Sequence, residues 1–136
     1  MSWREIDVPA DYFKGRTFVA IEVNDDKDAI VFTEDSGTQY RMYHDRDCCE
    51  TVDLYDVAGD LSDLIGTPIV EAEEVSNSDD KPSDYAESWT WTFYKFGTIK
   101  GHVTLRWLGE SNGYYSESVV ISIIGSDRYA TEASHG

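Results

Sequence analysis

The chain is a succession of short runs rich in β-branched and aromatic residues, separated by glycine, asparagine and aspartate. Runs of about four to eight such residues between turn residues are typical of β-strands. The runs are Thr17–Val23, Ala29–Glu34, Thr38–His44, Cys49–Tyr55, Thr67–Val75, Ser88–Phe96, Thr98–Leu108 and Tyr114–Ile124. We therefore expect a mainly β fold, with antiparallel sheets of about eight strands.

Turn signals join several of these runs into hairpins. Asp35-Ser36-Gly37 and Asn112-Gly113 supply glycine where a tight turn needs a positive φ. Pro9–Lys14 and Asp60–Ile65 are short helical candidates, because each has an acid near its start and a glycine after its end. The expected organisation is an N-terminal extension over 1–14, a single β-rich domain over 15–124 and a flexible tail over 125–136.

The two halves of the chain resemble each other. Four residues recur at identical spacing: Gly15, Phe18, Val19 and Glu22 match Gly66, Ile69, Val70 and Glu73. Glu50-Thr51-Val52 likewise matches Glu117-Ser118-Val119. This echo predicts two equivalent four-strand units, over about 9–55 and 60–124. The alternative is a chance similarity between β-hairpins.

Acidic residues dominate the charge, with a formal net charge of −16. Residues 45–87 contain fourteen acidic and two basic residues, whereas residues 88–109 contain three basic residues and no acid. Binding to nucleic acid or to anionic membranes depends on clustered Lys and Arg, so this composition argues against both partners. The candidate partner-binding acids are Asp53, Asp56, Asp60, Asp63, Glu71, Glu73 and Glu74. Solvated acidic loops are the alternative.

A cytoplasmic location is expected. No apolar run reaches the roughly 18 residues that span a bilayer. The first residues contain acids where a signal peptide needs an apolar run. Cys48 and Cys49 are adjacent, and adjacent cysteines rarely form a structural bridge, so both are expected to be reduced.

Residues 44–50 form the densest cluster of possible metal ligands. His44 and Cys48 are the weak candidates for a zinc ion. The usual spacing of zinc-binding cysteines is missing, and a strand would point Cys48 and Cys49 to opposite faces. We therefore expect no metal and no cofactor.

Glu50 and Glu117 face inward if each belongs to its predicted strand. A buried carboxylate needs a partner or takes up a proton. The two glutamates could form a catalytic pair like that of a glycosidase, or each could be structural. The structural interpretation is favoured, with partners expected from Lys100, His102, Arg106 or an aromatic N–H or O–H.

The hairpin from Ser88 to Leu108, with its turn expected at Gly97, has two dissimilar faces. One face, with Trp89, Trp91, Phe93, Ile99, Val103, Leu105 and Trp107, is expected in the core. The other face, with Tyr94, Lys100, His102 and Arg106, could bind an anion such as a nucleotide. A solvated face paired with the protein's own acids is the alternative. No recognised catalytic motif is present. We therefore favour a protein that is not an enzyme, and the sequence alone leaves this question open.

Two long strings carry a resemblance to a known family. DRDCCETVDLYDVAGDLSDLIGTPIVEAEEVSN and SWTWTFYKFGTIKGHVTLRWLGESNGYYSESV resemble a small family of uncharacterised proteins from bacteriophages and bacteria. The resemblance covers Gly15–Ile121 and leaves Met1–Lys14 and the tail after Ile124 outside. It implies a phage or mobile-element origin and no mechanism.

Three functions remain after these exclusions. The first is a non-enzymatic acidic binding protein, such as a phage-encoded inhibitor of a host protein with a basic surface, acting in the host cytoplasm. The second is a small-ligand binding protein or enzyme that uses the basic hairpin face together with Glu50 and Glu117. The third is a structural homodimer in which an edge strand such as Thr67–Val75 pairs with its copy.

Overall fold

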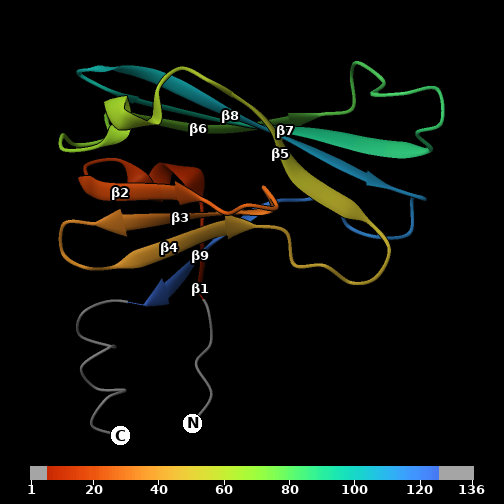
Figure 1. Ribbon diagram of the computed structural model, residues 1–136, viewed down its shortest axis with the longest axis horizontal. Coiled ribbons are helices and arrows are strands. Elements are labelled where there is room, and N and C mark those ends of the chain that lie inside the picture. The colour runs from red at the N-terminus through yellow and green to blue at the C-terminus, as the bar shows by residue number, and fades with distance from the viewer. Residues whose placement is uncertain (1–5, 126–136) are drawn as a thin grey trace, which may run out of the picture.

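The computed structural model describes residues 6–125, which fold into a sandwich of two antiparallel β-sheets (Figure 1). The elements are β1 (Ile6–Val8), η1 (Ala10–Phe13), β2 (Phe18–Val23), β3 (Ala29–Glu34), β4 (Gln39–Tyr43), β5 (Thr51–Ala58), η2 (Leu61–Leu64), β6 (Glu71–Asn77), β7 (Ser88–Thr98), β8 (Gly101–Ser111) and β9 (Val120–Gly125). The expected mainly β fold is confirmed, with nine strands in the described residues. The helical candidates η1 and η2 are short 3₁₀ segments, and no described helix could cross a membrane.

The two sheets enclose a core in which aromatic rings dominate. The five-stranded sheet has the order β1-β9-β4-β3-β2, and the four-stranded sheet has the order β5-β8-β7-β6. Phe13 from η1 packs against both sheets, with its ring centroid 5.1 Å from that of Phe32 and 5.5 Å from that of Phe96. Such contacts bury a large apolar area and hold the sheets together.

Residues 6–14 belong to this domain. Phe13 is fully buried, and β1 pairs with β9 from Ile6 to Val8. Residues 6–14 are therefore part of the sandwich rather than an extension before it, which corrects the predicted boundary at residue 15. All of the predicted tail except Gly125 lies outside the described residues.

The two halves of the chain have the same strand order. In the first half, β2, β3 and β4 form a meander, and β5 crosses to pair with β8 in the other sheet. In the second half, β6, β7 and β8 form a meander, and β9 crosses to pair with β4. Each sheet thus contains the three-stranded meander of one half and the crossing strand of the other half, and β1 adds a fifth strand to the first sheet beside β9.

Backbone hydrogen bonds join the halves just before their first strands. Gly15 N–H donates to the carbonyl of Ile69 at 2.8 Å, and Ile69 N–H donates to the carbonyl of Arg16 at 2.9 Å. Gly66 N–H donates to the carbonyl of Phe18 at 2.9 Å. Gly15 and Gly66 have φ of +84° and +90°, where side chains are rarely tolerated. The backbone of this joint therefore explains why both halves carry a glycine at this point.

The hairpin of β7 and β8 has a different register from the predicted one. Its turn is Ile99-Lys100 rather than Gly97. A shift of one residue in the pairing exchanges the faces on which side chains meet. Tyr94 is consequently buried in the core, whereas Trp91 lies opposite, on the outer face with Arg106. The prediction that put Trp91 in the core and Tyr94 beside Arg106 is wrong for this reason.

Candidate functional site

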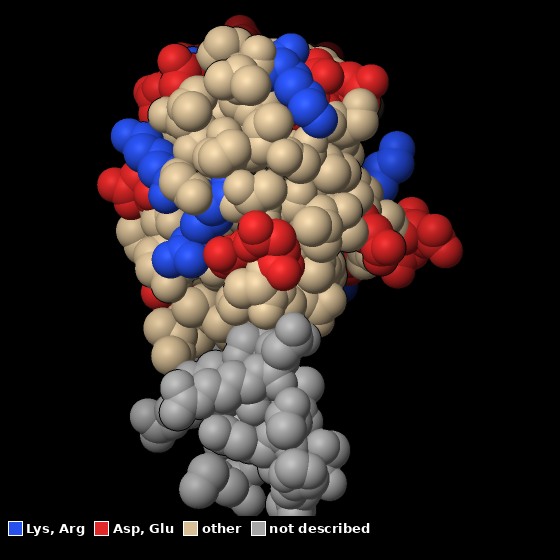
Figure 2. Space-filling view, turned by 90° about the vertical axis from the view of Figure 1, so that its left-hand side faces the viewer, with Lys and Arg blue, Asp and Glu red and all other residues tan. Residues whose placement is uncertain are grey.

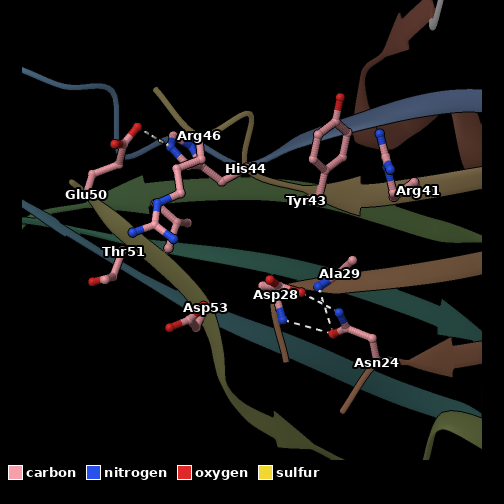
Figure 3. Close-up of a pocket in the computed structure, with 11 residues that line it drawn as sticks. Asn24, Asp28, Ala29, Arg41, Tyr43, His44, Arg46, Glu50, Thr51 and Asp53 are labelled. Carbon is pink, nitrogen blue, oxygen red and sulfur yellow. Dashed lines mark hydrogen bonds and ion pairs between the residues drawn. The ribbon is translucent and has the colours of Figure 1, made fainter. Parts of the chain in front are cut away.

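A polar cavity opens where the β2–β3 turn, the segment after β4 and the start of β5 meet (Figure 3). Its volume is about 390 Å³. The lining residues are Asn24, Asp28, Ala29, Arg41, Tyr43, His44, Arg46, Glu50, Thr51, Val52 and Asp53. It is the candidate functional site because acidic, basic and aromatic side chains from three separate segments meet in it.

Asn24 shapes one wall of the cavity. Its Oδ1 accepts hydrogen bonds from the backbone N–H groups of Asp28 at 2.9 Å and Ala29 at 3.1 Å. Its amide nitrogen donates to the Asp28 carboxylate. The carbonyl of Lys27 accepts a hydrogen bond from Leu54 N–H at 2.7 Å, which ties this turn to β5. The position of Asp28 relative to β5 is therefore fixed by both sets of bonds.

Glu50 and His44 form an ion pair at the opposite wall. The His44 Nε2 lies 2.8 Å from a carboxylate oxygen of Glu50, and the side chains are 5% and 0% exposed. The His44 Nδ1 lies 2.7 Å from the carbonyl oxygen of Ser118. Both ring nitrogens of His44 therefore face oxygen atoms that accept hydrogen bonds.

Hydrogen bonds keep Glu50 ionised. The backbone N–H groups of Asp47 and Cys48 each donate to its carboxylate at 2.9 Å. The bond from Asp47 N–H has the largest effect on the pKa, and the bonds from His44 and Cys48 add to it against the opposing effect of burial. Together they lower the pKa of Glu50 from an ordinary 4.5 to about 2.

Glu117 has the matching position before β9 but different partners. It is 9% exposed, and its carboxylate accepts hydrogen bonds from the hydroxyls of Thr90, at 2.7 Å, and Ser111. Both glutamates are thus buried and hydrogen-bonded, but neither has a hydrogen bond to Lys100, His102 or Arg106, where partners were expected. Each carboxylate is held by hydrogen bonds from its immediate neighbours, which favours a structural role for both.

The expectation of two reduced cysteines is wrong. Cys48 and Cys49 form a disulfide between adjacent residues. Both lie in a bend before β5, which begins at Thr51, so the alternation of faces along a strand does not separate them. Arg46 Nε donates to the carbonyl of Cys48 at 3.0 Å, which anchors the same bend beside the cavity.

Charges of both signs face each other across the cavity. Burial raises the pKa of the Asp53 carboxyl, and the negative charges of Asp28 and Asp26 raise it further, while Arg46 lowers it. The guanidinium of Arg41 lies over the ring of Tyr43, 4.0 Å from its centroid. The cavity lining therefore contains carboxylates and guanidinium groups close to one another.

Outside the cavity, aromatic side chains cover the outer face of the four-stranded sheet. We call Tyr55, Trp89, Trp91, Phe93 and Arg106 the aromatic face. The Arg106 guanidinium lies over the rings of Tyr55, at 4.7 Å, and Trp91, at 5.1 Å, and donates to Asp56 at 3.4 Å. Tyr55 is 59% exposed.

Part of the aromatic face is covered by the chain itself. The ring N–H groups of Trp89 and Trp91 each donate at 2.9 Å, to the carbonyls of Asp79 and Asp80. The segment between β6 and β7 therefore lies against this end of the face. Trp91 is only 6% exposed as a result, and Tyr55 and Arg106 remain open.

The predicted ligand residues do not come together. Lys100 donates to the carbonyl of Ile65 at 2.6 Å in the β7–β8 turn. His102 pairs with Glu71 at 2.8 Å on the outer face, where both side chains are largely exposed. Burial and the neighbouring Glu74 raise the pKa of the core residue Tyr94. Two of the basic side chains are thus paired with the protein's own acids, as the alternative interpretation anticipated.

The predicted acidic segment divides between two edges. Asp53 and Asp56 belong to edge strand β5, and Glu71, Glu73 and Glu74 belong to edge strand β6 of the same sheet. Asp60 and Asp63 lie at η2, where Asp60 caps the segment by accepting from Ser62 N–H at 2.9 Å. The hydrogen bonds from the Ser62 hydroxyl and from Ser62 N–H lower the pKa of Asp60. By contrast, the end of the sandwich in Figure 2 shows scattered charges of both signs on largely uncharged surface.

Sequence reasoning identified one wall of the cavity and missed the rest. The cluster His44–Glu50 was singled out as a possible metal site, but within the described residues no three His, Cys, Asp or Glu side chains group as metal ligands. Asn24, Asp28 and Arg41 were not predicted. The available signal was Asn24 four residues before Asp28, a spacing that suits a side chain closing a turn.

Comparison with known proteins identifies a family. The family described as "Domain of unknown function (DUF7448)" matches residues 11–121, from η1 to the second residue of β9. No curated protein and no solved structure matches the chain. The match includes both buried glutamates, the cavity and the strands from β2 to β8. The chain therefore belongs to the DUF7448 family.

Proposed function

We propose that the protein is a non-enzymatic binding protein whose partner is a protein with a basic surface. The carrying observation is the aromatic face, which lies between two edge strands with exposed acids. Asp56 on β5 lies beside the guanidinium of Arg106, and Glu71 and Glu73 are exposed on β6 at the opposite edge of the same sheet.

The composition of this surface supports the proposal. Tyr, Trp and Arg are the residue types that contribute most to binding energy in protein interfaces. Acids around such a centre steer a basic partner and raise its association rate, and the net charge of −16 extends this attraction. The same charge opposes direct binding to nucleic acid, which the proposal excludes.

A host-directed inhibitor is the specific form of this proposal. The phage origin comes from the family resemblance, and the setting would be the cytoplasm of the host. A disulfide is unusual in that compartment, so the redox state of Cys48 and Cys49 in cells is part of the test. Mass spectrometry after rapid alkylation in intact cells would measure it.

Pairing of two copies through β6 has less support. Glu71, Glu73 and Glu74 are all exposed on this edge strand. Charged residues on an edge strand oppose its pairing with a second copy. A homodimer is therefore not the function that we propose.

The test is affinity capture from host lysate at low salt and at about 0.5 M salt, where the Debye length is roughly 4 Å. The binding variant combines Asp56→Asn, Glu71→Gln and Glu73→Gln. The matched control combines Asp11→Asn, Glu22→Gln and Asp35→Asn, which removes as many exposed acids elsewhere. We expect a basic partner to be captured by the parent and by the control, and to be lost in the binding variant and in high salt.

A second variant tests the aromatic centre. Tyr55→Ala keeps the acids and removes the most exposed ring of the aromatic face. We expect it to lose the same partner while its melting temperature stays close to that of the parent. Equal capture by the parent, the triple binding variant and Tyr55→Ala would contradict the proposal.

A further inference from the structure

The cavity beside His44 and Glu50 has no part in the proposed binding function. We propose that it is a binding site for a small zwitterion of the α-amino-acid class, with Arg46 taking the carboxylate and Asp28 and Asp53 taking the ammonium group. None of the five residues of the aromatic face lines the cavity, so the inference does not depend on that face.

The size of the cavity suits such a ligand. A volume of about 390 Å³ lies in the range of small-molecule sites, roughly 300–1,000 Å³. Tyr43 and the nearly buried Val52 add apolar surface to the polar lining. The cavity can therefore enclose a charged backbone-like group together with a modest side chain.

Arg46 provides the anion-binding end. Its Nε is held by the carbonyl of Cys48 at 3.0 Å, and the Cys48 N–H is itself held by Glu50 at 2.9 Å. Within the described residues, the two terminal nitrogens of Arg46 have no hydrogen-bond partner, and Figure 3 shows the guanidinium extending between Glu50 and Asp53. A guanidinium fork of this kind matches the two oxygens of a carboxylate.

Asp28 and Asp53 provide the cation-binding end. Asn24 and the bond from Leu54 to the β2–β3 turn fix Asp28 beside β5. Burial raises the pKa of Asp53, and the negative charges of Asp28 and Asp26 raise it further while Arg46 lowers it. An ammonium group among these carboxylates offsets their negative charges and supplies up to three donors.

The balance of charges selects a zwitterion over other ligands. The lining contains the carboxylates of Asp28, Asp53 and Glu50 together with the guanidinium groups of Arg41 and Arg46, so charges of both signs are present in it. A simple anion would meet the two carboxylates and the field of a protein with net charge −16. A metal ion would lack ligands, since no three suitable side chains group together in the described part of the chain.

The experiment measures thermal stabilisation and calorimetric binding of the full chain with each of the common α-amino acids. For every amino acid that binds, the probes are its amide, which lacks the carboxylate, and its N-acetyl form, which lacks the ammonium group. We expect at least one amino acid to raise the melting temperature saturably. We expect both probes to bind at least about tenfold more weakly, because each loses a charged hydrogen-bonding group.

Variants assign the two ends. Arg46→Gln should weaken binding of the free amino acid at least about tenfold and leave binding of its amide unchanged. Asp53→Asn should weaken binding of the free amino acid by a similar factor and leave binding of its N-acetyl form unchanged. Asp45→Asn and Lys81→Gln, which are exposed and lie outside the lining, are the matched controls. Arg46→Lys keeps the positive charge of Arg46 without its forked guanidinium. It serves as a second variant in case Arg46→Gln does not fold.

Three results would overturn the proposal. The first is that no α-amino acid stabilises the protein at millimolar concentration. The second is that an amide or N-acetyl probe binds as tightly as its parent amino acid. The third is that Arg46→Gln and Asp53→Asn, shown to be folded by circular dichroism, bind like the controls.

Discussion

Glu50 and Glu117 occupy matched positions, and their partners determine how each responds to acid. Glu50 accepts from two backbone N–H groups and from His44, whereas Glu117 accepts from two hydroxyls. The hydrogen bonds from the backbone N–H of Asp47, from His44 and from the backbone N–H of Cys48 favour the ionised carboxylate, and the pKa of Glu50 is lowered to about 2. The loop from His44 to Glu50 is therefore organised around one permanent negative charge.

This charge gives a prediction for stability in acid. The unfolded chain binds a proton at Glu50 near pH 4.5, and the folded chain does so only near pH 2. The free energy of unfolding therefore falls as the pH drops through this window, because protons bind preferentially to the unfolded state. Glu50→Gln should be less stable than the parent at neutral pH, and the difference should shrink between pH 4.5 and pH 2.

Urea unfolding at a series of pH values measures this effect. Glu87→Gln, which removes an exposed glutamate, is the control and should follow the parent at every pH. Parallel curves for the parent and Glu50→Gln from neutral pH to pH 2 would show that the Glu50 carboxylate is not held in its ionised form.

The crossing of the chain from β8 in one sheet to β9 in the other depends on close backbone packing. Gly109 on β8 lies opposite Val52 on β5, and the segment before β9 passes over it. A Cβ at this position would lie 2.6 Å from the carbonyl oxygen and 2.8 Å from the Cβ of Glu117. The glycine therefore leaves room for Glu117 to approach the sheet.

Gly109→Ala should destabilise the fold. The added methyl group meets backbone, which cannot move without disturbing the hydrogen bonds of Glu117, and overpacking of this kind costs roughly 1–3 kcal/mol. Gly125→Ala is the control, because a Cβ there meets no atom within 4 Å. Thermal and urea unfolding should separate the two variants; equal stability would mean that β8 and the Glu117 segment can move apart freely.

Turn residues and alternating patterns within each segment predicted where the strands lie. Features that depend on pairing between strands distant in the sequence could not be predicted in this way. Asp35-Ser36-Gly37 correctly marked the β3–β4 hairpin because its turn chemistry lies within the segment itself. Asn112-Gly113 suggested a hairpin, but β9 begins only at Val120, because the chain there leaves one sheet for the other. β1 was missed because three residues, Ile6–Val8, become a strand only through pairing with β9.

The candidate site shows the same division. Glu50 was predicted to be buried and partnered, because strand alternation and the cost of burying a carboxylate are local arguments. The cavity itself brings together residues 24–29, 41–46 and 50–53, and their contact depends on how β5 crosses to the second sheet. No periodicity in the sequence contains that information.

At the scale of the whole molecule, neither half completes a sheet by itself. The first half supplies β5 to the sheet of the second, and the second half supplies β9 to the sheet of the first. The aromatic core also joins them, since Phe13 packs against both Phe32 and Phe96. The domain should therefore unfold as one cooperative unit.

Two separately expressed fragments, residues 1–58 and 59–136, test this interdependence. Each fragment alone leaves a meander with an uncovered apolar face, so neither should show a cooperative thermal transition. An equimolar mixture should regain the β-sheet circular dichroism and a single transition. Independent folding of either fragment would show that the crossing strands are dispensable.

The crossing of β5 and β9 also bears on the history of the chain. A polypeptide of half this length could complete its sheets by exchanging its last strand with an identical copy, as in a domain-swapped homodimer. Fusion of two such genes would retain that exchange within a single chain, with η2 following directly after the first crossing strand. Fusion would also release the two copies from having to remain identical. The imidazole partner of Glu50 and the hydroxyl partners of Glu117 are the kind of difference that such freedom permits.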